Sequence, residues 1–374
     1  MKILYLANLR MPTEKAYGYQ IAKMCEAFAL AGHQITLVAP SRRRLVTENF
    51  YDYYDIRKNF VFKVLPALDF YWPGMLDRPA VFLKNFISAF SLSFYAWRAD
   101  FDMILSRDEL PVFLVSFVRR NLVFEAHRYS GSRKIFYRRF KRAGIKVVAI
   151  SQGLKNAFLD HGFKSGNVLV AHDGVDLDEF NIDLNRAEAR RQLGLPEDKI
   201  ILGYVGQLKT MGMDKGLWIL FQAVVILRQE FDSVRLVIVG GSSGDIADYQ
   251  KLAREVGAGE TVLFVGRKAR HSIPIFLKAF DILVMPFPRT VHYDRYMSPL
   301  KLFEYMASGR PIAAAKLKTI SEVLDETCAV LVNPDDPRAL AGGAAELIRD
   351  PELGRSLAAR AIERVKNYTW QNPN

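Results

Sequence analysis

The sequence contains few of the residues that build metal sites and disulfides. Only two cysteines, Cys25 and Cys328, occur in 374 residues. They lie far apart and match no metal-ligand or redox spacing, so we expect two buried thiols in a reducing compartment. No metal site is expected, because five of the six histidines have no partner at metal-ligand spacing. These five, which we expect to be structural, are His33, His161, His172, His271 and His292.

Long apolar runs are also missing. The N-terminal segment Met1–Ala7 is too short for the apolar part of a signal peptide and reads as a first strand. The longest apolar stretch, Ala80 to Trp97, is interrupted by Lys84 and Asn85 and falls short of the ~20 apolar residues that a spanning helix needs. We therefore expect a cytoplasmic protein without a transmembrane segment.

Basic residues, in contrast, exceed acidic ones. The formal net charge of +12 favours an anionic partner, which could be a nucleic acid, a phosphorylated substrate or an acidic membrane surface. Basic clusters occur at Arg42-Arg-Arg44 and from Arg133 to Arg142, and the second interleaves aromatic residues at helical spacing. That pattern is typical of a basic amphipathic helix at a membrane or of a surface helix that packs its apolar stripe on the core.

Short apolar runs rich in β-branched residues alternate with helical patterns along the chain. This alternation predicts α/β domains with open, doubly wound parallel sheets, whose ligands bind beyond the carboxyl ends of the strands. We expect an N-terminal Rossmann-like domain at 1–175, a connection at 176–199 and a C-terminal Rossmann-like domain at 200–374. The expected strands are Lys2–Ala7, Ile35–Ala39, Val61–Leu65, Met103–Ser106, Leu122–Glu125, Lys146–Ile150, Asn167–Ala171, Ile200–Val205, Val234–Val239, Val262–Val265, Ile282–Met285, Ile312–Ala315 and Ala329–Val332.

A glycine-rich loop follows the first strand of the second domain. The segment Gly206-Gln-Leu-Lys-Thr-Met-Gly-Met-Asp-Lys-Gly216 has three glycines and two lysines and leads into a helix that begins near Leu217. Free backbone amides at a helix N-terminus and nearby lysines suit phosphate oxygens. We interpret the loop as a candidate phosphate contact without Walker spacing.

A more specific pattern is Ser298-Pro-Leu-Lys-Leu-Phe-Glu-Tyr-Met-Ala-Ser-Gly309. Ser298 is placed to cap a helix whose first position is Pro299. The amides of Leu300 and Lys301 and the lysine charge would meet a diphosphate at the helix opening.

Glu304 lies one helical turn further along that helix. A carboxylate beside a phosphate pocket repels phosphate but accepts hydrogen bonds from sugar hydroxyls. We therefore expect it to hold the ribose of a nucleotide.

These motifs resemble the donor-binding signature of family 4 glycosyltransferases, which have the GT-B fold of two facing Rossmann-like domains with a cleft between them. The likeness covers nearly the whole chain and includes Glu125-Ala-His127, His172-Asp-Gly-Val-Asp176, Asp214-Lys-Gly216 and the segment from Ser298 to Pro311. It implies catalytic roles for His127, Lys215 and Glu304, and an acceptor-side position for Gly18 and His127. The donor-binding residues that it implies are Gly206, Gln207, Lys209, Lys215, Gly266, Arg267, Lys268, Tyr296, Ser298, Pro299, Leu300, Lys301 and Glu304.

The chain departs from the family pattern at several positions. Tyr296 stands where many relatives have a glutamate that contacts the donor sugar, and either its hydroxyl or Asp294 could substitute. Gln207 replaces an arginine, and Lys209 could supply the lost charge. Two extra residues precede Lys215. Relatives continue beyond a motif like Tyr368-Thr-Trp370 into a helix that crosses to the first domain, and we expect that helix to be absent or removed here.

The resemblance implies a glycosyltransferase of cell-surface polysaccharide or glycolipid synthesis that moves a sugar from a UDP- or GDP-sugar to a sugar or lipid-linked acceptor. We expect retention at the anomeric carbon and no metal or other cofactor. The basic and aromatic stretches motivate peripheral contact with an anionic membrane at its inner face, and no nucleic acid is expected. The alternatives are a catalytically silent nucleotide-sugar-binding subunit and a GT-B sugar-nucleotide epimerase.

Overall fold

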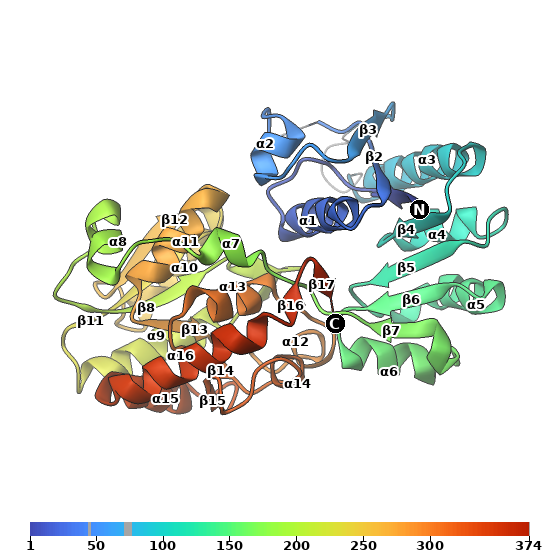
Figure 1. The fold of residues 1–374 in the computed structure, drawn as a ribbon. Coiled ribbons are helices and arrows are strands. Elements are labelled where there is room, and N and C mark those ends of the chain that lie inside the picture. Colours follow the sequence, from blue (N-terminus) through green and yellow to red (C-terminus); the bar gives the residue numbers. More distant parts are fainter. Residues whose placement is uncertain (44–45, 71–76, 374) are drawn as a thin grey trace. The chain divides into compact units, whose positions relative to one another are not determined.

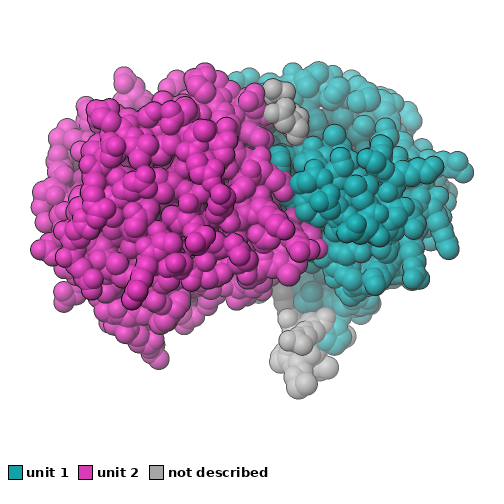
Figure 2. Space-filling view, turned by 90° about the horizontal axis from the view of Figure 1, so that it is seen from below, with its two compact units in different colours: residues 1–172, 370–374 teal, residues 173–369 magenta. Residues whose placement is uncertain are grey.

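The computed structural model describes residues 1–43, 46–70 and 77–373, so Arg44 of the first basic cluster lies outside the described residues. The chain forms two compact units. Unit 1 contains residues 1–172 and 370–374, and unit 2 contains residues 173–369 (Figures 1 and 2). Each unit has its own parallel sheet, so the expected α/β class with two Rossmann-like domains is confirmed.

Unit 1 is built on a seven-stranded parallel sheet with the order β3-β2-β1-β4-β5-β6-β7. Its strands are β1 (Lys2–Leu6), β2 (Gln34–Pro40), β3 (Val61–Leu65), β4 (Met103–Ser106), β5 (Leu122–Ala126), β6 (Lys146–Ala149) and β7 (Val168–Val170). Its helices are α1 (Ala16–Leu30), α2 (Phe50–Tyr54), α3 (Asp77–Arg98), α4 (Glu109–Val115), α5 (Lys134–Ala143) and α6 (Gln152–Asp160), with short 3₁₀ turns at Gly131–Arg133 and Ser165–Asn167.

The strand order of unit 1 reverses at β1, which pairs with β2 on one side and β4 on the other. Residues Ile3 to Leu6 of β1 are all buried, as expected for a parallel strand covered on both faces. Ligands of such sheets bind where the order reverses, beyond the carboxyl ends of the strands. The loops after β1 and β4 therefore mark the functional edge of unit 1.

Unit 2 has a six-stranded parallel sheet with the order β12-β11-β8-β13-β14-β15, which reverses between β8 and β13. Its strands are β8 (Ile200–Val205), β11 (Val234–Val239), β12 (Val262–Gly266), β13 (Ile282–Met285), β14 (Ile312–Ala315) and β15 (Val330–Val332), with a hairpin of β9 (Lys209–Thr210) and β10 (Met213–Asp214). Its helices are α7 (Leu177–Phe180), α8 (Arg186–Leu193), α9 (Leu217–Arg228), α10 (Ser243–Glu255), α11 (Ile273–Ala279), α12 (Val291–Arg295), α13 (Leu300–Ser308), α14 (Lys318–Ser321), α15 (Pro337–Arg349) and α16 (Pro351–Val365), with a 3₁₀ turn at Arg270–Ser272. The two-residue strands β16 (Tyr368–Thr369) and β17 (Asn372–Pro373) end the chain.

The stretch 176–199, which the sequence suggested as a connection, is placed in unit 2 instead. It forms α7 and α8, and Phe180 and Ala189 are buried in a core cluster of that unit. Arg190 is also buried, with its Nη2 2.5 Å from a carboxylate oxygen of Asp281 and its Nε donating to the carbonyl of Ala279. A charge-dense stretch can therefore belong to a domain when its apolar residues pack inward and a buried cation finds its partners.

The thirteen strands expected from apolar runs are all present, and their bounds differ by no more than a residue or two. Both cysteines are unpaired and buried, as expected. In the basic segment, Tyr137 and Phe140 of α5 are buried while Lys134, Arg138, Lys141 and Arg142 are exposed. Part of the apolar stripe of that segment therefore packs on the core, and the cations remain on the surface.

Candidate functional site

Three glycines, Gly206, Gly240 and Gly266, lie at the carboxyl ends of neighbouring strands in unit 2. Gly206 follows β8 and donates to the carbonyl of Val239 at 2.8 Å, and Gly240 follows β11 and donates to the carbonyl of Gly266 at 2.8 Å. All three have positive φ angles. A Cβ on Gly240 would lie 2.3 Å from the carbonyl oxygen of Gly206, so only glycine allows the backbones to approach this closely.

The loop after Gly206 folds into the β9–β10 hairpin. Met211 and Gly212 at its turn both have positive φ, as a two-residue hairpin turn requires. The two extra residues before Lys215 are thus accommodated by a hairpin. On β9, Lys209 lies 3.4 Å from a carboxylate oxygen of Asp245 and 3.1 Å from one of Asp248. Two carboxylates therefore contact the ammonium that could supply the charge missing at Gln207.

The N-terminus of α9 differs from expectation. Asp214 accepts hydrogen bonds from the amides of Gly216 at 2.6 Å and Leu217 at 3.4 Å, and from the hydroxyl of Tyr249. These amides are satisfied by a carboxylate, so this helix end does not offer them to phosphate. The loop contributes the side chain of Lys215 instead.

Gly216 holds this loop against the end of β13. Its φ is +88°, and a Cβ there would lie 1.7 Å from the carbonyl oxygen of Pro286. Gly216→Ala should therefore lower the free energy of unfolding by about 2–4 kcal/mol through backbone strain plus a clash. Gly212→Ala is the matched control, because its φ is +79° but the space around it is open, and strain alone should cost about 1–2 kcal/mol. Equal losses in denaturant unfolding would contradict the assignment of the close contact.

Helix α13 begins beside the same strand ends, and its capping corrects our expectation. The N-cap is Pro299, with an extended ψ of 120°, and not Ser298. The hydroxyl of Ser298 instead accepts the amide hydrogen of Asp173 at 3.0 Å. No side chain caps α13, so the amides of Leu300 and Lys301 stand at a positive helix end without a side-chain acceptor, which is the usual setting for an anion.

Lys301 is the strongest sign of a ligand site. Its side chain is buried, and within the described part of the chain its Nζ has no hydrogen-bond partner. The Nζ lies 3.5 Å from the centroid of the Tyr204 ring and would be 3.2 Å from a Cβ on Gly206. A buried ammonium without an acceptor is costly unless a ligand supplies one. Lys301, and not Lys209, therefore brings the second cation to the Gly206 end of β8.

Lys215 lies close enough to Lys301 for the two charges to interact. Burial lowers the pKa of Lys215 to about 8. Burial and then the charge of Lys215 lower the pKa of Lys301 well below its ordinary value, and Glu304 offsets part of that effect. Burial therefore favours the neutral form of both lysines, and an anion bound beside them at the uncapped helix end would favour their protonated forms.

Glu304 is held by an arginine that our sequence reasoning missed. Its Oε1 is 2.5 Å from Nη1 of Arg270, whose Nη2 is 3.2 Å from a carboxylate oxygen of Glu179. Glu304 is buried, one turn along α13 from Lys301. Arg270 thus fixes the carboxylate at the end of α13 that carries the lysine. The pattern gave no signal for it, because the three residues come from separate loops and helices.

The remaining predicted donor residues lie in the surrounding loops. Arg267 and Lys268 are exposed just after β12, and Tyr296 is half-buried at the end of α12. The carboxylate of Asp294 accepts the amide hydrogen of Lys318 at 3.2 Å, so it is engaged at the start of α14. Of the two possible substitutes for the missing glutamate, Asp294 is therefore already hydrogen-bonded within the protein, and Tyr296 is the better candidate.

His292, which we expected to be structural, lies within the range of the charge of Lys215. Burial and then the charge of Lys215 lower its pKa, which places its ring near that lysine. It lies on α12, in the segment between β13 and α13. We judged His292 in the sequence only by metal-ligand spacing. Its position in a strand-end loop could have suggested a place near Lys215.

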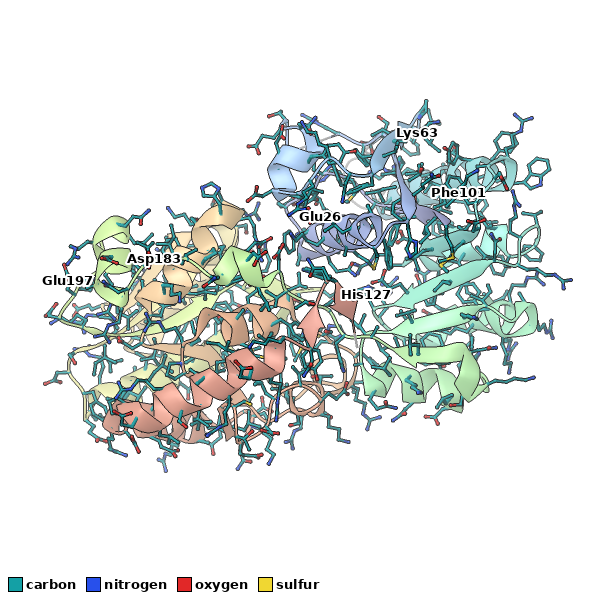
Figure 3. The ribbon with its side chains drawn as sticks, viewed as in Figure 1. Glu26, Lys63, Phe101, His127, Asp183 and Glu197 are labelled. Atoms are coloured by element: carbon teal, nitrogen blue, oxygen red, sulfur yellow. The ribbon has the colours of Figure 1, made fainter. Side chains whose placement is uncertain are left out.

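In unit 1, the predicted His127 belongs to a buried polar cluster at the end of β5 (Figure 3). Its Nε2 is 2.7 Å from Oε1 of Glu125, and Glu125 also accepts from the hydroxyl of Tyr5 at 2.8 Å and the amide of Gln20 at 2.5 Å. The side-chain amide oxygen of Gln20 accepts from Arg107 at 3.0 Å. Residues from β1, α1, β5 and the end of β4 thus meet at the edge where the strand order reverses.

The electrostatics of this cluster fix the state of His127. Burial raises the pKa of Glu125, but His127, Arg107 and the hydrogen bond from Tyr5 outweigh it and hold the pKa at about 2. Burial and the charge of Arg107 lower the pKa of His127, with Glu125 opposing them. Because an ionised carboxylate only accepts, Nε2 must carry the proton and Nδ1 is left as an acceptor.

Gly18 owes its identity to packing beside this edge. A Cβ there would lie 2.1 Å from the hydroxyl oxygen of Tyr54 and 2.6 Å from Cγ2 of Thr13. The Tyr54 hydroxyl accepts from the amide of Thr13 at 2.8 Å. The glycine therefore lets the loop before α1 close on α2, and this position shapes the predicted acceptor side.

Metal-binding clusters and surface hollows also bear on the site. Within the described ranges, no three histidine, cysteine or acidic side chains gather in a way that could hold a metal ion. A hollow of about 570 Å³ in unit 2 is lined by residues such as Arg228, Gln250 and Glu260, and none of the predicted site residues lines it.

Known protein families and solved structures resemble this chain. The family model described as Glycosyltransferase Family 4 matches residues 18–179, and the model described as Glycosyl transferases group 1 matches residues 185–364. A D-inositol 3-phosphate glycosyltransferase of Corynebacterium urealyticum is 27% identical over 68% of this chain and 61% of its own length. One of Stackebrandtia nassauensis is 30% identical over 55% of this chain and 46% of its own length. The chain thus spans about half to three fifths of these relatives.

Solved structures share the fold. Alr3699/HepE of Anabaena in complex with UDP and glucose has a TM-score of 0.74 at 20% identity, over 99% of this chain and 95% of that chain. Sucrose-phosphate synthase of Thermosynechococcus elongatus has a TM-score of 0.76 at 20% identity, over the same shares. Both family models and this two-domain GT-B fold agree with the motifs quoted above, and the chain belongs to the family 4 (group 1) glycosyltransferases.

Proposed function

We propose that this protein transfers a sugar from a nucleoside-diphosphate sugar to an acceptor hydroxyl. The observation that carries the proposal is the buried, unpartnered ammonium of Lys301 beside Lys215 and the uncapped start of α13. Among the described residues, no carboxylate forms an ion pair with either lysine. Such a site is built for a multiply charged anion.

The diphosphate would lie between the amides of Leu300 and Lys301 and the two ammonium groups. Glu304, fixed by Arg270, would accept hydrogen bonds from ribose hydroxyls, and the exposed loop from Gly266 to Lys268 would contact the base. The lysines and the helix end would neutralise the charge that develops on the leaving diphosphate, so we propose that the reaction needs no metal.

We propose retention at the anomeric carbon through front-side displacement. The bond from the anomeric carbon to the diphosphate oxygen breaks as the acceptor oxygen bonds to the same face of that carbon. The acceptor proton passes to the departing phosphate oxygen, so charges balance. His127, with Nδ1 as an acceptor, would orient a hydroxyl of the donor sugar or acceptor in unit 1.

The acceptor is proposed to be a sugar or a lipid-linked sugar, in the synthesis of a cell-surface polysaccharide or glycolipid. No helix in the described part of the chain is long and apolar enough to cross a membrane. We propose peripheral contact with an anionic membrane at its inner face, and the exposed cations of α5 support it.

Incubation with a panel of UDP- and GDP-sugars tests the proposed function. At least one donor should raise the melting temperature and release its nucleoside diphosphate, slowly with water and faster when an acceptor is supplied. Binding without any release, with every acceptor tried, would favour the silent binding subunit. Release of the nucleoside diphosphate with an unsaturated sugar, and no transfer, would favour the epimerase.

The affinity for nucleoside diphosphate should fall as the pH rises through about 8. The ligand binds the protonated lysines, and Lys215, with its pKa near 8, loses its proton above that pH. The loss should reach up to about tenfold between about pH 7.5 and pH 9, and Lys215→Met should remove this step. Calorimetric titration at several pH values measures it.

The stability of the free protein should change in the opposite direction. Because the folded pKa of Lys215 lies below its unfolded value, the unfolded state binds more protons between about pH 8 and pH 10.5, and the contribution of this group to stability rises with pH there. An affinity for nucleoside diphosphate that stays constant or rises between about pH 7.5 and pH 9 would contradict the role of a protonated Lys215.

A further inference from the structure

Helix α3 of unit 1 exposes a stripe of aromatic side chains. Phe82, Phe86, Phe90, Phe94 and Trp97 follow one another at spacings of three or four residues, and each is between 43% and 71% exposed. Residues at this spacing lie on one face of a helix. A parallel row at four-residue spacing is buried and contains Ala80, Lys84, Ser88, Leu92 and Ala96.

An arginine-lined hollow lies beside the C-terminal end of α3. It measures about 270 Å³ and is lined by Arg119, Arg120, Arg139 and Arg142, together with Ser116, Phe117, Val118 and Ala143. Arg119 donates to the carbonyls of Trp97 and Ala99, and Arg139 donates to the hydroxyl of Ser116 at 2.9 Å. Within the described ranges, none of the four arginines forms an ion pair with a carboxylate, so the hollow keeps a concentrated positive charge.

The stripe and the hollow form one continuous surface. Arg119 joins the turn after α4 to the last turn of α3 through its bond to Trp97. Phe117 is 59% exposed at the rim, with the guanidinium of Arg139 4.2 Å from its ring centroid. The exposed side chains of Val118 and Ile135 extend the apolar part.

We propose that this surface docks on a lipid bilayer, with the headgroup phosphate of an anionic phospholipid in the arginine hollow and the α3 stripe in the headgroup region. A bilayer offers a broad apolar phase and phosphate groups at one boundary, which matches an aromatic stripe beside a cluster of unpaired guanidinium groups. Guanidinium groups bind phosphate through two parallel hydrogen bonds. Aromatic residues favour the interface because it accommodates their apolar rings.

Arg42 of the first basic cluster is engaged by the protein itself. Its side chain is 7% exposed, lies 3.6 Å from a carboxylate oxygen of Asp69 and donates to the hydroxyl of Ser88 at 2.6 Å. It anchors α3 from the protein side. The cations of the proposed surface come from the turn after α4 and from α5.

Flotation with vesicles in the absence of donor tests the proposal. At low salt, the protein should bind vesicles of phosphatidylglycerol and phosphatidylcholine in equal amounts, and pure phosphatidylcholine much less. Arg120→Ser with Arg142→Ser should weaken binding by roughly 10–30-fold, because each cation near an anionic surface contributes about fivefold. Phe82→Ser with Phe90→Ser should also weaken it at both low and high salt.

Lys164→Ser with Arg289→Ser is the matched control for charge, since both residues are exposed elsewhere and the net charge changes equally. Leu169→Ser controls for loss of an exposed apolar residue. Binding that fails for the wild type, ignores headgroup charge or falls equally in the controls would overturn the proposal. Lipid-free self-association that Phe82→Ser with Phe90→Ser abolishes would also overturn it, by identifying a second copy as the partner.

This inference builds on the lipid-linked acceptor proposed above, but the two can fail separately. Vesicle binding is measured without donor, and release of nucleoside diphosphate is measured without vesicles. The surface variants should keep the wild-type rate of donor hydrolysis in solution, because none of the substituted residues belongs to the donor site in unit 2.

Discussion

Replacement of Lys215 by methionine is expected to lower sugar transfer by roughly 10²–10³-fold, the usual effect of losing one group that stabilises developing charge. Methionine keeps much of the side-chain volume and removes only the ammonium. Burial already lowers the pKa of Lys215 to about 8, so the charge is costly in the free protein. The variant should therefore be at least as stable as the wild type. Steady-state transfer and thermal unfolding, measured together, separate the two effects.

Lys301→Met should behave in the same way, because this buried ammonium has no hydrogen-bond acceptor among the described residues. Lys209→Met is the matched control in the same region. Lys209 is neutralised by Asp245 and Asp248, so its loss should change transfer less than about threefold. An equal loss of transfer in Lys209→Met, or near-normal transfer in Lys215→Met, would sink the assignment of the phosphate contacts.

Glu304→Ala should lower transfer by roughly 10²-fold or more and weaken nucleoside-diphosphate binding. A carboxylate that accepts ribose hydroxyls through charge-assisted hydrogen bonds contributes about 1.5–3 kcal/mol. Titration with the nucleoside diphosphate and assays of transfer at saturating donor measure the two losses.

Glu179→Ala distinguishes ribose binding from simple neutralisation of Arg270. Both carboxylates bind Arg270, Glu304 at 2.5 Å and Glu179 at 3.2 Å. If Glu304 only balanced that guanidinium, both variants would have similar effects. We expect Glu179→Ala to retain most of the donor affinity, and similar losses in both would show that Glu304 does not hold the ribose.

The elements that the sequence predicted best are those set by local composition. Buried parallel strands need unbroken apolar runs, and Ile200–Val205 and Val234–Val239 were therefore located to the residue. Helix α13 was also found, because its apolar face and Gly309 mark its course and end. That Lys301 and Glu304 lie one turn apart on the same helix follows from their spacing alone.

The features that were missed depend on contacts between distant segments. Ser298 is of a residue type that often caps helices, but its hydroxyl accepts the amide hydrogen of Asp173 instead. Arg270 meets Glu304 only because the turn after β12 lies beside α13. Lys209 seemed a substitute cation until α10 placed two carboxylates beside it. The contact of Asp214 with the amide of Gly216, in contrast, could have been found, since aspartate side chains often accept from a backbone amide two residues further on.

We propose above all that unit 2 binds two phosphates and a ribose through Lys215, Lys301 and Glu304. Calorimetric titration of the wild-type protein with a nucleoside diphosphate, the matching monophosphate and the diphosphate of the dideoxynucleoside tests it most directly. The diphosphate should bind at least about tenfold more tightly than either analogue, because each lacks groups that meet charged partners. The three ligands should carry the base that binds most tightly. Equal affinity for all three would contradict this assignment of the phosphate and ribose contacts.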